Sequence, residues 1–337
     1  MRRRDMASST ALLETAFSPE LPGDPLPPGP RANRWPGELV EIAEVGATAA
    51  AIHRLWRARG RHPRPDGNPT TVPRRAVPSA GGCYPVQWHL VVPPGRRRSL
   101  GPGRYVYDPA TEMLVRRPDP RGPVWPASDQ VEIVLTVQPG RTFGRYRHRA
   151  WPLWVADAAY ALEALLRLVP DAYLPADWSD LAAARRSLRL PRAAPATWWL
   201  ERGLVPELAL ARIRLPHDPH LDEVASAAIC ARRSPALDRF HERRAQPSAD
   251  SRTEAARQSG QSWVLGADRV VGWPRPARLD AVGYAQLWQI HREAARQTYS
   301  LTAQGHSVRA VSGFCPRPAE ARPLVHAIAI LENGTAA

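Results

Sequence analysis

The sequence of 337 residues contains no lysine, so all 46 residues in its lysine-plus-arginine total are arginines. Against 32 acidic residues this gives a formal net charge of +14. Such a surplus predicts an acidic partner, which would be a nucleic acid, an acidic peptide or a cofactor phosphate, or it reflects an arginine-rich surface in contact with water. Since no motif of a nucleic-acid-binding fold accompanies the charge, we do not expect nucleic acid as a partner.

Cysteines and long apolar runs are scarce too. Cys83, Cys230 and Cys315 are too few and too scattered for a disulfide framework or a zinc site, so we expect no metal and a reducing compartment. The basic start of the chain has only a short apolar stretch, which Glu14 interrupts, and no later segment approaches the length of a membrane span. The sequence predicts a cytoplasmic protein without membrane contact.

Proline and glycine divide the rest of the sequence into segments. The run Pro19–Pro36 cannot form a helix or a central strand, so residues 1–35 are predicted to be a flexible lead-in. A shift in composition near Leu215 predicts one domain over 36–215 and a second over 216–337. Apolar periodicity and turn residues predict helices at 38–57, 151–169 and 281–303, strands at 86–92, 104–108, 131–137, 308–314 and 324–331, and a polar linker at 246–261.

One loop stands out because five consecutive positions carry no bulky side chain. These are Pro78, Ser79, Ala80, Gly81 and Gly82, and a strand follows them. Such a loop allows backbone to lie against a flat ligand, or it is simply a tight turn before a strand.

The same loop carries a resemblance to a known family. Residues 73–92, which contain P-S-A-G-G-C-Y-P, and residues 101–117, which contain Y-V-Y-D-P, resemble the SagB-type branch of the nitroreductase family, and residues 141–166 match that branch in register. The resemblance implies an α+β fold with an antiparallel central sheet flanked by helices. It also implies an FMN cofactor against Pro78 to Gly82, oxidation of azoline rings to azoles in a modified precursor peptide, and a cyclodehydratase partner.

A second, shorter resemblance lies at residues 232–240. This R-R-S-P-A-L-D-R-F segment resembles the opening of a nitroreductase domain, which implies that Arg232, Arg233 and Ser234 hold the flavin phosphate; the alternative is a basic helix end on the surface. Residues 216–337 would then be a shortened second copy, with Gly313 in a late strand that faces the flavin. Because this fold builds its flavin site between two halves, we expect a homodimer or an internal pseudo-dimer.

The expected catalytic pair departs from the family pattern. Where the family has Lys-Tyr, this sequence has Arg145 and Tyr146. A guanidinium stabilises negative charge but does not act as a base. Tyr146 serves as the base only if a neighbouring cation lowers its pKa, and otherwise it is a packed aromatic in a chain that has lost catalysis. The open alternatives are therefore a partner subunit without turnover and a general NAD(P)H-dependent nitro or quinone reductase.

Other polar and aromatic residues have simpler interpretations. His217 and His220 lie among prolines and predict a solvated loop rather than a metal site. His89 lies in an apolar strand and predicts a hydrogen-bonded core histidine. Trp198 and Trp199 are expected to pack in the core, although they would also suit stacking on a substrate ring.

Overall fold

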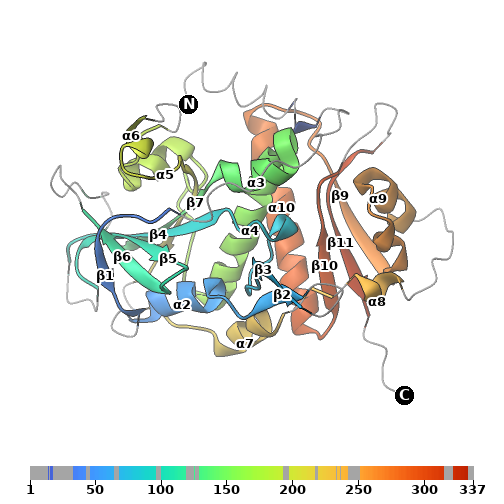
Figure 1. Cartoon of the computed structure of the whole chain (residues 1–337), viewed down its shortest axis with the longest axis horizontal. Coiled ribbons are helices and arrows are strands. Elements are labelled where there is room, and N and C mark those ends of the chain that lie inside the picture. The colour runs from blue at the N-terminus through green and yellow to red at the C-terminus, as the bar shows by residue number, and fades with distance from the viewer. Residues whose placement is uncertain are drawn as a thin grey trace.

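Two antiparallel sheets lie on either side of a pair of long helices in the computed structural model (Figure 1). The structure describes residues 14, 16–17, 33–42, 46–63, 68–95, 100–118, 125, 129–192, 197–216, 219–232, 234–235, 237–241, 251–314 and 322–332. In this part of the chain no helix is long and apolar enough to span a bilayer.

The larger sheet has six strands in the order β1-β6-β5-β4-β7-β8, and every pair is antiparallel. The strands are β1 (Glu38–Val40), β4 (Val86–Val92), β5 (Gly103–Asp108), β6 (Met113–Arg117), β7 (Val131–Val137) and β8 (Leu208–Leu215). All residues of β4 and β7 are buried, because helices or loops cover both faces at the centre of the sheet. The predictions for β4, β5 and β7 are confirmed, whereas β6 and β8 were not predicted.

Helices α4 (Ala150–Leu168) and α10 (Ala281–Ala303) run side by side through the middle of the molecule (Figure 1). Both match their predicted ranges. Pro152 lies in the first turn of α4, where its missing N–H leaves no hydrogen bond unmade. Asp280 is the N-cap residue of α10, and its carboxylate accepts hydrogen bonds from the backbone N–H groups of Val282 and Gly283.

The smaller sheet has the order β10-β11-β9, with strands β9 (Arg269–Pro274), β10 (Ser307–Val311) and β11 (Leu324–Leu331). Helices α8 (Asp238–His241) and α9 (Ser251–Ser259) lie at the outer side of this sheet (Figure 1). The prediction of a polar linker at 246–261 is therefore wrong for residues 251–259, which form α9. That segment is a helix because Ala255 and Ala256 bury its inner face, even though most of its side chains are polar.

Shorter elements complete the fold. They are α2 (Gly46–Trp56), β2 (Arg61–Pro63), β3 (Pro69–Pro73), η2 (Ala80–Gly82), α3 (Pro139–Tyr146), η3 (Arg147–Arg149), α5 (Leu181–Ser187), α6 (Thr197–Leu200), α7 (Glu223–Ala231) and η4 (Ser262–Gly266). The helix predicted from residue 38 begins at Gly46 instead. Residues 38–40 form β1, because they pair in antiparallel register with Leu114, Val115 and Arg116 of β6.

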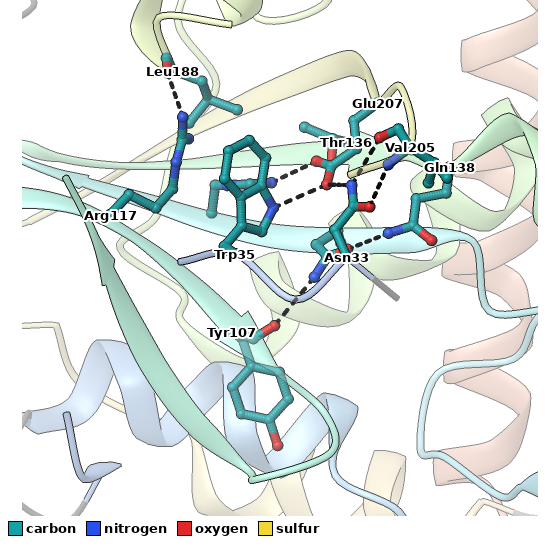
Figure 2. A network of polar contacts seen from close by, with 11 residues as sticks. Asn33, Trp35, Tyr107, Arg117, Thr136, Gln138, Leu188, Val205 and Glu207 are labelled. Atoms are coloured by element: carbon teal, nitrogen blue, oxygen red, sulfur yellow. Dashed lines mark hydrogen bonds and ion pairs between the residues drawn. The ribbon is translucent and has the colours of Figure 1, made fainter. Parts of the chain in front are cut away.

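The end of the predicted lead-in is fixed to the larger sheet by a buried polar network (Figure 2). Glu207 accepts hydrogen bonds from Asn33 Nδ2 at 2.5 Å, Trp35 Nε1 at 3.1 Å and Thr136 Oγ1 at 2.6 Å, and its other neighbour is His89 Nε2 at 2.8 Å. The prediction of a flexible lead-in is thus wrong for residues 33–35, and most of residues 1–32 lie outside the described part of the chain. The prediction of a hydrogen-bonded core histidine at His89 is confirmed.

The two predicted domains share a hydrophobic core. Leu287, Trp288 and Tyr299 of α10 pack in the same buried cluster as α4 and the larger sheet. Trp199 is fully buried in a second cluster with Trp35, which confirms core packing there. The division at residue 215 remains a prediction.

Candidate functional site

The loop at residues 78–82 is anchored from beneath by Asp157 of α4. The Ser79 hydroxyl donates to Asp157 Oδ2 at 2.6 Å, and the backbone N–H of Ala80 donates to Asp157 Oδ1 at 2.9 Å. Ser79 Oγ in turn accepts from the backbone N–H of Tyr84 at 2.8 Å. These contacts hold the serine side chain inward and leave the backbone at the crown of the loop facing outward.

The two glycines of the loop are required by its conformation. Gly81 and Gly82 have φ angles of 56° and 66°, in the left-handed region that favours glycine. A Cβ at Gly81 would lie 2.6 Å from Tyr146 Oη, and one at Gly82 would lie 2.7 Å from Val72 Cγ1. Gly81 is nevertheless exposed to solvent on its remaining side, so the loop presents bare backbone.

The predicted catalytic pair lies directly over this loop. Arg145, exposed at the end of α3, donates from Nη1 to the Gly81 carbonyl oxygen at 3.0 Å. Tyr146 lies between Gly81 and Gly313, since a Cβ at Gly313 would be 3.6 Å from Tyr146 Cε1. Segments near residues 80, 146 and 313 therefore meet at one place, and the last of them comes from the C-terminal part of the chain.

The environment of Tyr146 keeps its phenol protonated. Burial raises the pKa of Tyr146 to about 12 and outweighs the Arg145 guanidinium, which acts in the opposite direction. Cys83 and Asp157 add to the rise, and a hydrogen bond with the Ser312 side chain opposes it. The condition for a tyrosine base, a pKa lowered by a neighbouring cation, is not met. Tyr146 is instead a hydrogen-bond donor at neutral pH.

Two further titratable groups lie beneath the loop. Burial raises the pKa of Asp157 to about 7, although its hydrogen bonds from Ser79 and Ala80 act to lower it. Burial likewise raises the pKa of the Cys83 thiol to about 11, so this cysteine is a neutral thiol rather than a reactive thiolate. Asp157 is therefore the group of this site whose charge changes near neutral pH.

The segment that carries the second resemblance also reaches the loop. Arg232 is buried, and it donates from Nε to the Ala76 carbonyl oxygen at 2.9 Å and from Nη1 to Ser234 Oγ at 3.1 Å. Arg232 is therefore not on the surface, although whether this segment holds a flavin phosphate remains a prediction. Arg233 lies outside the described residues.

Three residues of this site were not predicted. The only sequence feature that pointed to Asp157 is that it is a carboxylate in a mostly apolar helix. Arg309 of β10 donates from Nη1 to the Pro235 carbonyl oxygen at 2.7 Å and interacts electrostatically with Tyr146. Ser312 follows the same strand. Neither of the latter two had a sequence signal, because their proximity to Tyr146 depends on how α10 and the smaller sheet fold back.

Two cavities lie away from this cluster. One of about 650 Å³ is lined by residues at the edge of the larger sheet, and one of about 420 Å³ is lined by Ile42 and residues of α2. The side of Gly81 that faces Tyr146 is closed by protein. Among the described residues, no group of three or more metal-ligating side chains comes together, and His220 is exposed while His217 lies outside them.

Comparison with known proteins identifies the fold. No protein-family model and no curated protein matches the chain. Among solved structures, it is similar to a protein from Anabaena variabilis described as a nitroreductase, with a TM-score of 0.62 and 14% identity over 89% of this chain and 93% of that one. It also matches the E. coli microcin synthetase McbBCD complex with truncated pro-MccB17 bound, with a TM-score of 0.32 and 15% identity over 54% of this chain and 68% of that one. The chain therefore has a nitroreductase-like α+β fold.

Proposed function

We propose that the protein is an FMN-dependent oxidoreductase that oxidises azoline rings to azoles in a modified peptide. The observation that carries the proposal is the meeting of the bare loop at Gly81, the Arg145–Tyr146 pair and Gly313 at one place. These are the segments that the family resemblance assigns to the flavin and to catalysis. The nitroreductase-like fold supports the proposal independently of those motifs.

The donors around the loop fit a flavin phosphate and a flat ring. Arg145 is exposed and uses Nη1 for the Gly81 carbonyl, and a guanidinium has five N–H donors. Arg232 and Arg309 add positive charge on the side toward the C-terminal part of the chain. Because the loop itself is held by Asp157, its backbone is already in place to contact a planar ligand. Arg145 would move off the Gly81 carbonyl oxygen when the flavin binds.

The chain's own residues would orient the substrate and control protons. FMN would supply the hydride acceptor, since conversion of an azoline to an azole removes one hydride and one proton. The proton would pass to water, because neither Tyr146 nor Arg145 is a base at neutral pH. Tyr146 donates a hydrogen bond from Oη, because its pKa is raised to about 12. Arg145 stabilises negative charge that develops on the ring being oxidised. The packing of Tyr146 against Gly81 and Gly313 fixes its hydroxyl in position.

A second function is favoured by the same pKa. A phenol that stays protonated donates a hydrogen bond, and such a donor suits a nitro or quinone oxygen that gains negative charge during reduction. The second candidate is therefore a general NAD(P)H-dependent reductase on the same flavin site. A partner subunit without turnover remains the outcome if no flavin binds.

The experiment compares two tyrosine variants of the FMN-loaded protein. Tyr146→Phe removes one hydroxyl and keeps the ring that packs on Gly81 and Gly313. Tyr173→Phe is the matched control, because Tyr173 is an exposed tyrosine that lies beside Arg214 at the β8 edge of the larger sheet. Turnover of an azoline-containing peptide is followed by mass spectrometry, since oxidation removes two hydrogens, and NADPH consumption with a quinone is measured in parallel.

We expect Tyr146→Phe to lower peptide turnover on the order of 100-fold with FMN still bound, and Tyr173→Phe to match the wild type. Full peptide turnover by Tyr146→Phe would remove Tyr146 from the mechanism. Steady NADPH consumption without peptide oxidation would replace the proposal by the reductase. If the protein does not bind FMN, both enzymatic proposals fail and the partner subunit without turnover is favoured.

A further inference from the structure

The 650 Å³ cavity at the edge of the larger sheet is rich in positive charge. Its lining includes Arg104, Arg116 and Arg117 but a single carboxylate, Glu38. We call this cavity the arginine pocket; its remaining lining is Gly37, Pro94, Pro102, Gly103, Pro118 and Trp125. A volume of this size lies within the range of about 300–1,000 Å³ that is common for ligand sites. None of these residues belongs to the candidate flavin site.

The strand register brings two of the arginines together. Arg104 of β5 is the direct cross-strand partner of Arg117 of β6, so two like charges lie opposite each other on one face of the sheet. Like charges in that arrangement are destabilising by themselves, and an anion placed between them relieves the repulsion. Arg116, the next residue on β6, points to the opposite face of the sheet, where it pairs across the strands with Glu38 and lies 3.8 Å from its carboxylate. It borders the pocket at the edge of the sheet.

Each guanidinium is already oriented by a backbone carbonyl or an aromatic ring. Arg104, only 4% exposed, donates from Nε to the Ser187 carbonyl oxygen at 2.8 Å and lies 5.3 Å from the centre of the Trp125 ring. Arg117 lies 4.0 Å from the centre of the Trp35 ring and donates to the Leu188 carbonyl oxygen at 3.3 Å (Figure 2). Pre-oriented guanidinium forks match carboxylates and lose little entropy when they bind them.

The position of the pocket favours an extended peptide as its occupant. Strand β1 is the last strand of the sheet in the described part of the chain, where it pairs with β6. Gly37 and Glu38 line the pocket, and Leu39 beside them is 51% exposed. An added strand along β1 would make main-chain hydrogen bonds, cover Leu39 and bring its acidic side chains toward Arg116 and Arg117 of β6.

We propose that the arginine pocket binds a carboxylate-rich segment of the peptide on which the enzyme acts. This inference rests on the proposed function for the identity of the peptide, but the binding itself needs neither flavin nor turnover. The pocket would hold the substrate by a segment distinct from the ring that is oxidised.

The test measures binding of a fluorescein-labelled peptide of alternating glutamate and glycine by fluorescence anisotropy with the full chain. Arg116→Gln removes an exposed charge from the pocket. Arg269→Gln is the matched control, because Arg269 is also an exposed strand arginine, 3.9 Å from the carboxylate of Glu332, on the smaller sheet. Arg117→Gln is the second pocket variant, and circular dichroism checks that each variant is folded.

We expect Arg116→Gln and Arg117→Gln each to weaken binding on the order of tenfold, with Arg269→Gln unchanged, and added salt to weaken it further. Equal binding by all folded variants, or absence of binding by the wild type, would overturn the proposal. Displacement of the probe by a single-stranded oligonucleotide at lower concentration than by unlabelled peptide would assign the pocket to nucleic acid instead. A flavin-free protein that binds the peptide leaves this inference standing even if the proposed redox function fails.

Discussion

Substitution of Gly81 by alanine tests the geometry of the candidate site directly. The added Cβ meets two separate obstacles. The left-handed backbone at φ 56° disfavours alanine by about 1–2 kcal/mol. The methyl group would also lie 2.6 Å from Tyr146 Oη and 2.9 Å from Arg145 Nε, and overpacking of this kind adds about 1–3 kcal/mol unless those side chains move. We therefore expect Gly81→Ala to lower the free energy of unfolding by about 2–5 kcal/mol.

Gly203→Ala separates the two terms. Gly203 has a φ of 64°, and an added Cβ would meet nothing within 4 Å. This control should therefore lose only about 1–2 kcal/mol, the backbone contribution. Urea unfolding of both variants, followed by circular dichroism, gives the difference. Equal destabilisation of the two variants, with unchanged FMN affinity in Gly81→Ala, would refute the close packing of Tyr146 on the loop.

Three further predictions concern buried polar groups and are measured by urea unfolding, the first two across a range of pH. Burial raises the pKa of Asp157 from 3.8 to about 7 in the folded protein, so its contribution to stability is complete below pH 3.8 and is lost as the pH rises through 7. The free energy of unfolding should therefore fall by about 4 kcal/mol over this range. Asp157→Asn should remove this dependence on pH, and an unchanged dependence would contradict the assignment. Burial lowers the pKa of His326 from 6.5 to about 3, so stability should fall by about 5 kcal/mol as the pH drops from 6.5 toward 3, and His326→Gln should fall less steeply. Glu207→Gln should cost about 3 kcal/mol at neutral pH, because an amide cannot accept all of its buried hydrogen bonds, and a neutral effect would rule out the network in Figure 2.

Periodicity in the sequence predicted the elements whose burial is strongest. Helices α4 and α10 and strands β4, β7 and β11 bury nearly continuous apolar runs or regular faces, so their ranges follow from local sequence. The errors fall where tertiary contacts override a weak pattern. Residues 38–40 have helix-compatible spacing but form β1, because β6 offers an edge to pair with.

The candidate site was predictable only in its local parts. The loop at 78–82 was found because its lack of side chains is visible in sequence, and the conformation of Gly81 and Gly82 agrees with that interpretation. The assignment of Arg145–Tyr146 came from the resemblance, but the raised pKa of Tyr146 depends on burial by elements far away in the chain. Arg309 approaches that phenol only through the tertiary fold, which no local pattern encodes.

The loop around Gly81 is the centre of the account, and titration of the purified full chain with FMN tests it most directly. We predict saturable quenching of flavin fluorescence by the wild type, and much weaker binding by Gly81→Ala than by Gly203→Ala. Absence of quenching by the wild type, or identical affinities of the two glycine variants, would contradict the placement of the flavin at this loop.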